Sequence, residues 1–221
     1  MKEITSCYRN RFDNTEKKRK DRIWQLLCQY FFQKLISHKD VVMDLGAGYC
    51  EFINHIKCLE KIAIDKNPDT KKYAEKNVKV LNLNIKSLKK NYENKIDKIF
   101  VSNFFEHLDS KEEILDYFNV AHSILKTEGL IIIMQPNIKL VNGKYWDFID
   151  HKIPLTASSI VEALEINNFE IVNVIEKFLP FTTKNSFPIL PFIIYIYLRM
   201  PIWMRINAGQ SLIIAKKTIR D

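Results

Sequence analysis

Glycine and cysteine are both scarce in this chain of 221 residues. It has five glycines, and two of them, Gly46 and Gly48, stand two positions apart. Its four cysteines form no CxxC pair, which argues against the dense disulfide framework of a small secreted domain and favours reduced thiols. The spacing of histidines, cysteines and acids matches no metal-binding pattern, so no metal site is expected.

Long hydrophobic runs are also missing. The longest stretch without charge, Asn185 to Leu198, is too short to span a bilayer and contains two prolines. The N-terminal residues have no apolar segment typical of a signal peptide. We therefore expect a cytoplasmic protein.

The net charge is +8, which fits contact with nucleic acid, an anionic membrane surface or a negatively charged substrate, or a lysine-rich background. The lysines are scattered and form no basic stripe with interleaved aromatic residues, so no nucleic-acid partner is expected. Hydrophobic residues make up 47% of the chain and charged residues 27%, which predicts a packed globular core. The length suits one large domain.

Short apolar runs alternate with segments of helical periodicity along most of the chain. Continuous apolar strands separated by helices are typical of a parallel sheet covered on both faces, which predicts an α/β fold. The expected strands are 41–45, 61–64, 78–83, 96–101, 130–134, 169–175 and 211–215. The expected helices are 21–37, 51–58, 69–76, 111–125 and one that starts at Thr156. We expect a single domain over 1–221, divided into a tail and helix (1–37), a core (38–177), an apolar insertion (178–207) and a last strand and tail (208–221).

The two close glycines lie between the first expected strand and the first core helix. Glycine allows a ligand to approach the backbone, and a helix start offers unpaired N–H groups, so this unit indicates a nucleotide-like cofactor. The third glycine of GxGxxG is missing, and Cys50 replaces a common third glycine of such loops. This argues against NAD, although a dehydrogenase stays an alternative. Asp65 ends the second strand, where a carboxylate suits ribose hydroxyls.

Four segments carry a family resemblance: Val42 to Gly48, Ala63 to Asp65, Asp97 to Leu108 and Leu125 to Ile133. Through them, residues 40–175 resemble class I S-adenosylmethionine-dependent methyltransferases. The resemblance implies a Rossmann-like sheet of seven strands with helices on both faces, whose last strand, 211–215, is antiparallel. It also implies that S-adenosylmethionine is the cofactor.

The same resemblance assigns residues to the cofactor. Asp44, Gly46, Ala47 and Gly48 would line its methionine and ribose parts, or Asp44 would only brace the loop. The other implied cofactor residues are Asp65 at the ribose, Lys66, Asn84 and Ile85 at the adenine, and Asn103 and Phe104 at the sulfonium. In the N-terminal tail, Arg11 could pair with the methionine carboxylate.

Methyl transfer is mainly a matter of alignment and desolvation, but a hydroxyl acceptor benefits from a general base. The candidate bases are His107 and His151, with Asp150 as the acid that orients them. The alternative is that Glu106 and His107, like Asp150 and His151, only cap the segments that follow them.

The insertion 178–207 is aromatic and rich in proline. It could be a lid over an apolar acceptor, a dimer face or an interfacial membrane contact through 187–204, at the inner face of a membrane. The segments Asp150 to Thr156 and Phe178 to Lys184 resemble bacterial methyltransferases found among glycan- and lipid-biosynthesis proteins. We therefore expect O-methylation of a small-molecule or lipid-linked sugar acceptor. The alternatives are an RNA or protein methyltransferase and a non-catalytic, cofactor-binding scaffold subunit.

Overall fold

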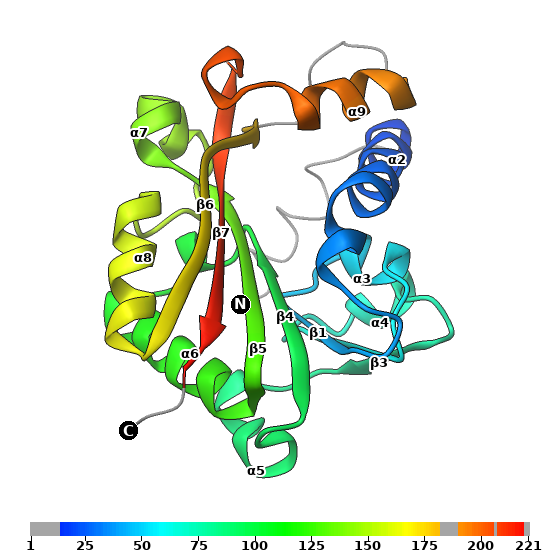
Figure 1. Cartoon of the computed structure of the whole chain (residues 1–221), viewed down its shortest axis with the longest axis vertical. Helices are drawn as coiled ribbons and strands as arrows, with labels where there is room; N and C mark the ends of the chain where they lie inside the picture. The colour runs from blue at the N-terminus through cyan, green and yellow to red at the C-terminus, as the bar shows by residue number, and fades with distance from the viewer. Residues whose placement is uncertain (1–13, 182–189, 206, 219–221) are drawn as a thin grey trace.

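The computed structural model describes residues 14–181, 190–205 and 207–218, and they form one seven-stranded sheet with helices on both faces (Figure 1). The strand order is β3-β2-β1-β4-β5-β7-β6. The strands from β3 to β5 run parallel, and β7 is antiparallel to both of its neighbours. The strands are β1 (Val41–Leu45), β2 (Glu60–Ile64), β3 (Val78–Leu81), β4 (Ile96–Ser102), β5 (Leu125–Pro136), β6 (Phe169–Pro180) and β7 (Ala208–Lys217). This architecture confirms the expected fold.

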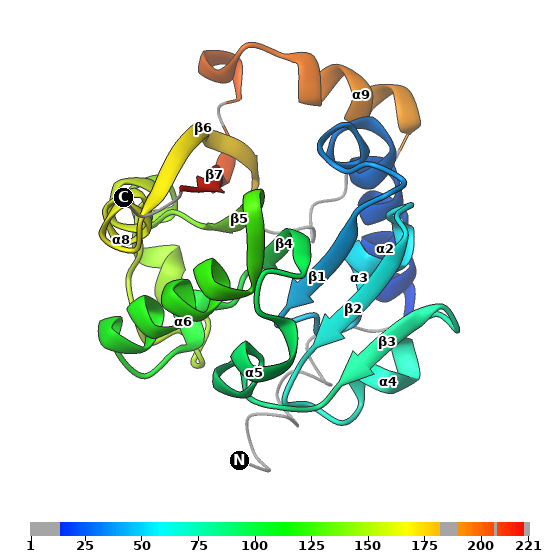
Figure 2. The same cartoon turned by 60° about the horizontal axis from the view of Figure 1, so that its bottom comes forward.

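The helices divide between the two faces of the sheet. The face that carries α2 and α3 lies opposite the face that carries α6 and α8 (Figures 1 and 2). The helices are α2 (Asn14–Tyr30), α3 (Glu51–His55), α4 (Thr70–Tyr73), α5 (Lys89–Tyr92), α6 (Lys111–Ile124), α7 (Ile138–Val141), α8 (Ala157–Ile166) and α9 (Pro191–Arg199). The 3-10 turns are η1 (Phe32–Leu35), η2 (Ile85–Ser87), η3 (Phe105–His107), η4 (Asn142–Asp147) and η5 (Ile202–Met204).

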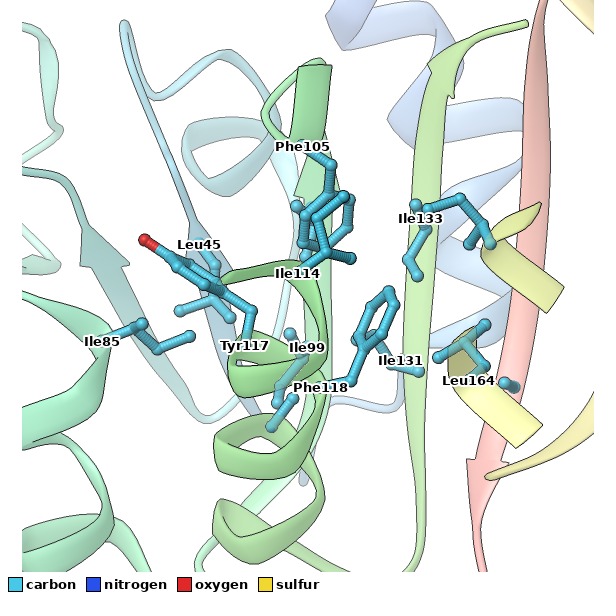
Figure 3. Close-up of a cluster of buried hydrophobic side chains, with 14 of the residues drawn as sticks. Leu45, Ile85, Ile99, Phe105, Ile114, Tyr117, Phe118, Ile131, Ile133 and Leu164 are labelled. Carbon is cyan, nitrogen blue, oxygen red and sulfur yellow. The ribbon is translucent and has the colours of Figure 1, made fainter. Parts of the chain in front are cut away.

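The central strands bury apolar side chains on both faces. In β5, Ile131 and Ile133 join the core under α6 and α8, whereas Ile132 and Met134 join the core under α2 and α3. This follows from the alternation of side chains along a strand. Figure 3 shows Phe118 of α6 lying over Ile131 in the first of these cores. Burial on both faces explains why the strands are continuous apolar runs in the sequence.

The first described helix starts earlier than expected. Residues 14–20 were assigned to the polar tail, but α2 begins at Asn14, and the helical path tightens into η1 after Tyr30. The turn brings Phe32 against Phe100 of β4, with ring centroids 5.2 Å apart. Aromatic packing on the sheet therefore decides where this helix ends.

Two strands at the far side of the sheet are longer than the sequence predicts. β5 begins at Leu125 and includes Glu128 and Gly129, whereas the expected strand begins at residue 130. β6 continues to Pro180, because its antiparallel pairing with β7 runs on to Ala208. The insertion is therefore shorter than 178–207.

Helix α9 lies beside α2 (Figure 1). The rings of Tyr30 and Tyr195 meet edge to face, with centroids 5.4 Å apart. Buried Arg205 donates hydrogen bonds to the carbonyl oxygens of Leu198 (2.8 Å) and Phe178 (3.4 Å), which ties the end of α9 to β6. Within the described ranges, no helix has the length and apolar character needed to cross a bilayer.

Candidate cofactor and acceptor site

The strand order changes direction between β1 and β4. The connection after β1 leads to α3 on one face, and the connection after β4 leads to α6 on the other. In open α/β sheets, ligands bind at the carboxyl ends of the strands at such a switch point. The candidate site is therefore made by the loops that follow these two strands.

The loop after β1 has the backbone of a glycine turn. Gly46 has φ +73° and Gly48 has φ +51°. The N–H of Gly46 donates to the carbonyl oxygen of Ile64 at 2.8 Å, which fixes the loop on the end of β2. Cys50 also has a positive φ of +61°, a region that favours glycine. The loop therefore keeps a glycine-type path although the sequence places cysteine there.

Phe104, from the loop after β4, packs directly on this turn. A Cβ atom added at Gly46 would lie 2.4 Å from Cδ2 of Phe104. Glycine is thus needed both for the left-handed backbone and for the approach of this ring. The structure brings together these two residues, which the sequence assigned to the same site.

Asp65 stands at the tip of β2 and faces the glycine loop. One carboxylate oxygen accepts from the N–H of Gly48 at 2.7 Å, and the other accepts from the N–H of Asn67 at 2.8 Å. Each oxygen keeps a further lone pair that can accept from a ligand hydroxyl. The half-buried position fits the ribose hydroxyls of S-adenosylmethionine.

Asp44 is buried beneath the loop, with 3% of its surface exposed. Burial, together with the nearby carboxylates of Glu51 and Asp65, raises the pKa of Asp44 well above its usual range. A ligand that carries positive charge near this carboxylate would favour its ionised form. S-adenosylmethionine carries both a sulfonium and an ammonium group, so the residues present fit this cofactor.

The residues predicted for the adenine lie after β2 and β3. Ile85 is buried, and Lys66 is exposed. The side-chain oxygen of Asn84 accepts from the N–H of Lys86 at 3.1 Å, so Asn84 also caps η2. Asn103 is exposed with φ +48°, and its side chain donates to Ser102. Arg11 lies outside the described residues.

The candidate catalytic residues meet at the carboxyl end of β4. The carbonyl oxygen of Glu106 accepts from the N–H groups of Lys152 (2.7 Å) and Ile153 (3.2 Å), which brings the segment with Asp150 and His151 against η3. His107 Nδ1 lies 3.0 Å from the carbonyl oxygen of Asp150 and 3.6 Å from its carboxylate. The rings of His107 and His151 have centroids 5.1 Å apart.

Glu106 belongs to this cluster, although the sequence left open whether it touches the substrate or only caps the segment that follows it. Its side chain is 1% exposed, and neither carboxylate oxygen has a hydrogen-bond partner. His107 Nε2 lies 3.9 Å away. Burial raises the pKa of Glu106. The sequence does contain a signal for this role, because an acid stands next to a histidine shortly after an apolar strand.

Gln135, at the carboxyl end of β5, was missed. It is 1% exposed, and both polar atoms of its amide lack a hydrogen-bond partner. Nearby Asn137 donates to Ser211 of β7 at 3.0 Å and so braces the end of the sheet. A polar residue that closes an apolar strand marks Gln135 as a candidate contact for a ligand.

The comparisons with known proteins agree with this geometry. A family model described as a methyltransferase domain matches residues 43–133, from β1 to β5. The span includes the glycine loop, Asp65 and η3. The chain therefore carries a methyltransferase domain over these residues. No curated protein matches it.

Solved structures resemble this methyltransferase in fold over most of its length. An S-adenosylmethionine-dependent methyltransferase from Archaeoglobus fulgidus is 22% identical, with 90% of this chain and 94% of that chain covered and a TM-score of 0.64. A second, from Mesorhizobium loti, is 11% identical, with 83% and 94% covered and a TM-score of 0.57. These two methyltransferases therefore share the fold of this chain.

Proposed function

We propose that this methyltransferase transfers a methyl group to a hydroxyl oxygen of a small-molecule or lipid-linked sugar acceptor. The observation that carries the proposal is the cluster of half-buried imidazoles and buried carboxylates at the end of β4. It follows directly after Phe104, which packs on the cofactor loop. A hydroxyl placed there would lie beside groups able to remove its proton.

The cofactor is held by the loops at the switch point. Asp65 accepts from the ribose hydroxyls, and Asp44 faces the positive charge of the cofactor. The remaining cofactor contacts that we propose are Gly46, Ala47 and Gly48 by their backbone, Lys66, Asn84 and Ile85 at the adenine, Asn103 and Phe104 near the sulfonium, and Arg11 at the methionine carboxylate.

When bound, S-adenosylmethionine supplies an electrophilic methyl group: the acceptor oxygen forms the new O–C bond, the C–S bond breaks, and S-adenosylhomocysteine and a proton are released. The chain orients the acceptor and disposes of that proton. His107 and His151 are the proposed catalytic residues. Asp150 positions His107 through its carbonyl oxygen at 3.0 Å.

An apolar patch on α9 and η5 supports an acceptor that is attached to lipid. We define the apolar patch as the exposed residues Leu190, Phe192, Ile193, Ile196, Ile202, Trp203 and Met204. Arg199 is exposed at the end of α9, and the chain has a net charge of +8. Apolar side chains beside positive charge suit an anionic membrane surface. We propose that the methyltransferase is cytoplasmic and contacts the inner face of a membrane through this patch.

The test is transfer of label from S-adenosylmethionine carrying a radioactive methyl group. The wild-type protein and His107→Ala would be supplied in parallel with lipid-linked sugars, soluble sugars, RNA and protein. Base-stable label in a sugar fraction, lost in the variant, is the expected result. Label in RNA or protein would overturn the choice of acceptor. Binding of S-adenosylhomocysteine without turnover on any pool would indicate a scaffold subunit.

A further inference from the structure

We infer that Glu106, His107 and His151 bind a divalent metal ion. One ligand atom from each of the three side chains lies within 4.8 Å of the others. Glu106 and His107 belong to η3, and His151 comes from the segment before α8. The backbone hydrogen bonds from Lys152 and Ile153 to Glu106 hold these two segments together.

The carboxylate of Glu106 is the first argument for a cation. It is 1% exposed and accepts no hydrogen bond. An ionised carboxylate in such a place is strongly unfavourable unless a positive charge or hydrogen-bond donors compensate it. Within the described residues, no lysine or arginine forms an ion pair with it, and His107 Nε2, at 3.9 Å, would compensate the charge only if the ring were protonated. A bound cation would supply the missing compensation.

The tautomer of His107 is the second argument. A carbonyl oxygen can only accept a hydrogen bond, so the contact of 3.0 Å to Asp150 places a proton on Nδ1. The neutral ring then carries its lone pair on Nε2, the nitrogen that lies 3.9 Å from the carboxylate of Glu106. A histidine that binds a metal through one nitrogen usually donates the N–H of the other to a backbone carbonyl or a carboxylate, as His107 does to Asp150.

The ligand set indicates the kind of ion. Two imidazoles and one carboxylate favour a transition ion such as Zn²⁺ or Mn²⁺, whereas Mg²⁺ and Ca²⁺ prefer oxygen ligands. Three protein ligands leave a coordination position open, as in catalytic rather than structural sites. An acceptor oxygen could take that position.

The role of the ion rests on the proposed function, but its binding does not. A hydroxyl bound to a divalent cation loses its proton more readily than a free one. The cation would thus stabilise the alkoxide of the bound acceptor, whose proton would leave to solvent, and His107 and His151 would then act as ligands of the ion instead of as bases. Binding of the metal alone can be measured without any acceptor.

The experiment is a calorimetric titration of the full-length protein, freed of metal by a chelator, with Zn²⁺, Mn²⁺ and Mg²⁺. We expect one site that binds Zn²⁺ or Mn²⁺ more tightly than Mg²⁺. Glu106→Gln and His151→Ala should each weaken that binding by at least about tenfold. The control is His38→Ala, which removes an exposed histidine outside the cluster and should bind like the wild type.

A second measurement shows that the variants are folded. Each is tested for stabilisation by S-adenosylhomocysteine in a thermal shift assay, and binding of this ligand without metal binding supports the assignment. No metal binding by the wild type, or unchanged binding in folded Glu106→Gln, would overturn it. Metal binding that depends on Glu106 in a protein that methylates no oxygen would uphold the metal site and overturn only the proposed function.

Discussion

The carboxylate of Asp65 accepts a hydrogen bond of 2.7 Å from the backbone N–H of Gly48. This bond joins the tip of β2 to the loop after β1, so the residue that we assign to the ribose also shapes the loop that holds the methionine part. The cofactor loop and the acidic residue therefore act as one unit.

Replacing Asp65 with alanine should weaken binding of S-adenosylhomocysteine by at least about tenfold, which corresponds to about 1.4 kcal/mol. The variant loses the acceptor for the ribose hydroxyls and the brace of the loop. Calorimetry measures the dissociation constant. The matched control is Asp116→Ala, which removes a surface carboxylate on α6 that pairs with Lys86. Equal affinity of Asp65→Ala and the wild type would rule out this role.

Alanine at Gly46 should lower the free energy of unfolding by about 2 kcal/mol or more, because the residue has φ +73° and the new Cβ would lie 2.4 Å from Phe104. Urea denaturation followed by circular dichroism measures the loss. Gly143→Ala is the control, since a Cβ at Gly143 meets no atom within 4 Å. A Gly46→Ala protein as stable as Gly143→Ala would show that the turn tolerates side chains.

The sequence predicts the sheet well because each central strand is buried on both faces and reads as an apolar run. The ends of the strands are less predictable. Pairing with β7 extends β6, and the residues of neither strand show this pairing by themselves. The start of α2 was missed because a run of charged residues, Lys17 to Lys20, is equally typical of a tail.

The cofactor part and the acceptor part of the site also differ in how well the sequence predicts them. The proximity of the glycine loop and Asp65 could be predicted, because Gly46, Gly48 and Asp65 each follow a strand closely. The acceptor part could be predicted only as separate candidates. His107 and His151 are distant in the chain, and the backbone bonds from Lys152 and Ile153 to Glu106 that bring them together leave no sequence pattern.

Removing either imidazole should lower turnover while the cofactor still binds. His107→Ala and His151→Ala are each expected to reduce kcat by about 100-fold, because proton removal or its metal-assisted equivalent is lost. Affinity for S-adenosylhomocysteine should stay near that of the wild type. His55→Ala, which breaks a pair with Asp21 on the far face, is the control. Full turnover in both cluster variants would refute the catalytic assignment.

The cysteines of the fold should resist alkylation in the native protein. Burial raises the pKa of Cys50 to about 12 and that of Cys58 to about 11, so little thiolate exists at pH 8, and the thiolate fraction grows only as the pH rises towards these values. In a Cys7→Ser background, iodoacetamide should modify the native protein slowly and the urea-unfolded protein fast. Mass spectrometry counts the labels. Equally fast labelling of the native and the unfolded protein would show that the fold does not protect these thiols.

The apolar patch should carry binding to lipid vesicles. Phe192→Ser with Trp203→Ser removes two of its most exposed rings, at 60% and 76% exposure. Sedimentation with vesicles that contain anionic lipid should fall several-fold in this variant and should weaken with salt. The control is Leu59→Ser, since Leu59 is 71% exposed outside the patch. Unchanged sedimentation of the double variant would remove the patch as a membrane contact.

The most direct measurement is a crystal structure of the protein with S-adenosylhomocysteine bound. The account predicts that the ribose hydroxyls lie on Asp65, that the ligand follows the Gly46 to Gly48 loop, and that its sulfur faces the side of the site formed by Glu106, His107 and His151. A ligand bound elsewhere, or a sulfur atom that faces away from this cluster, would contradict it.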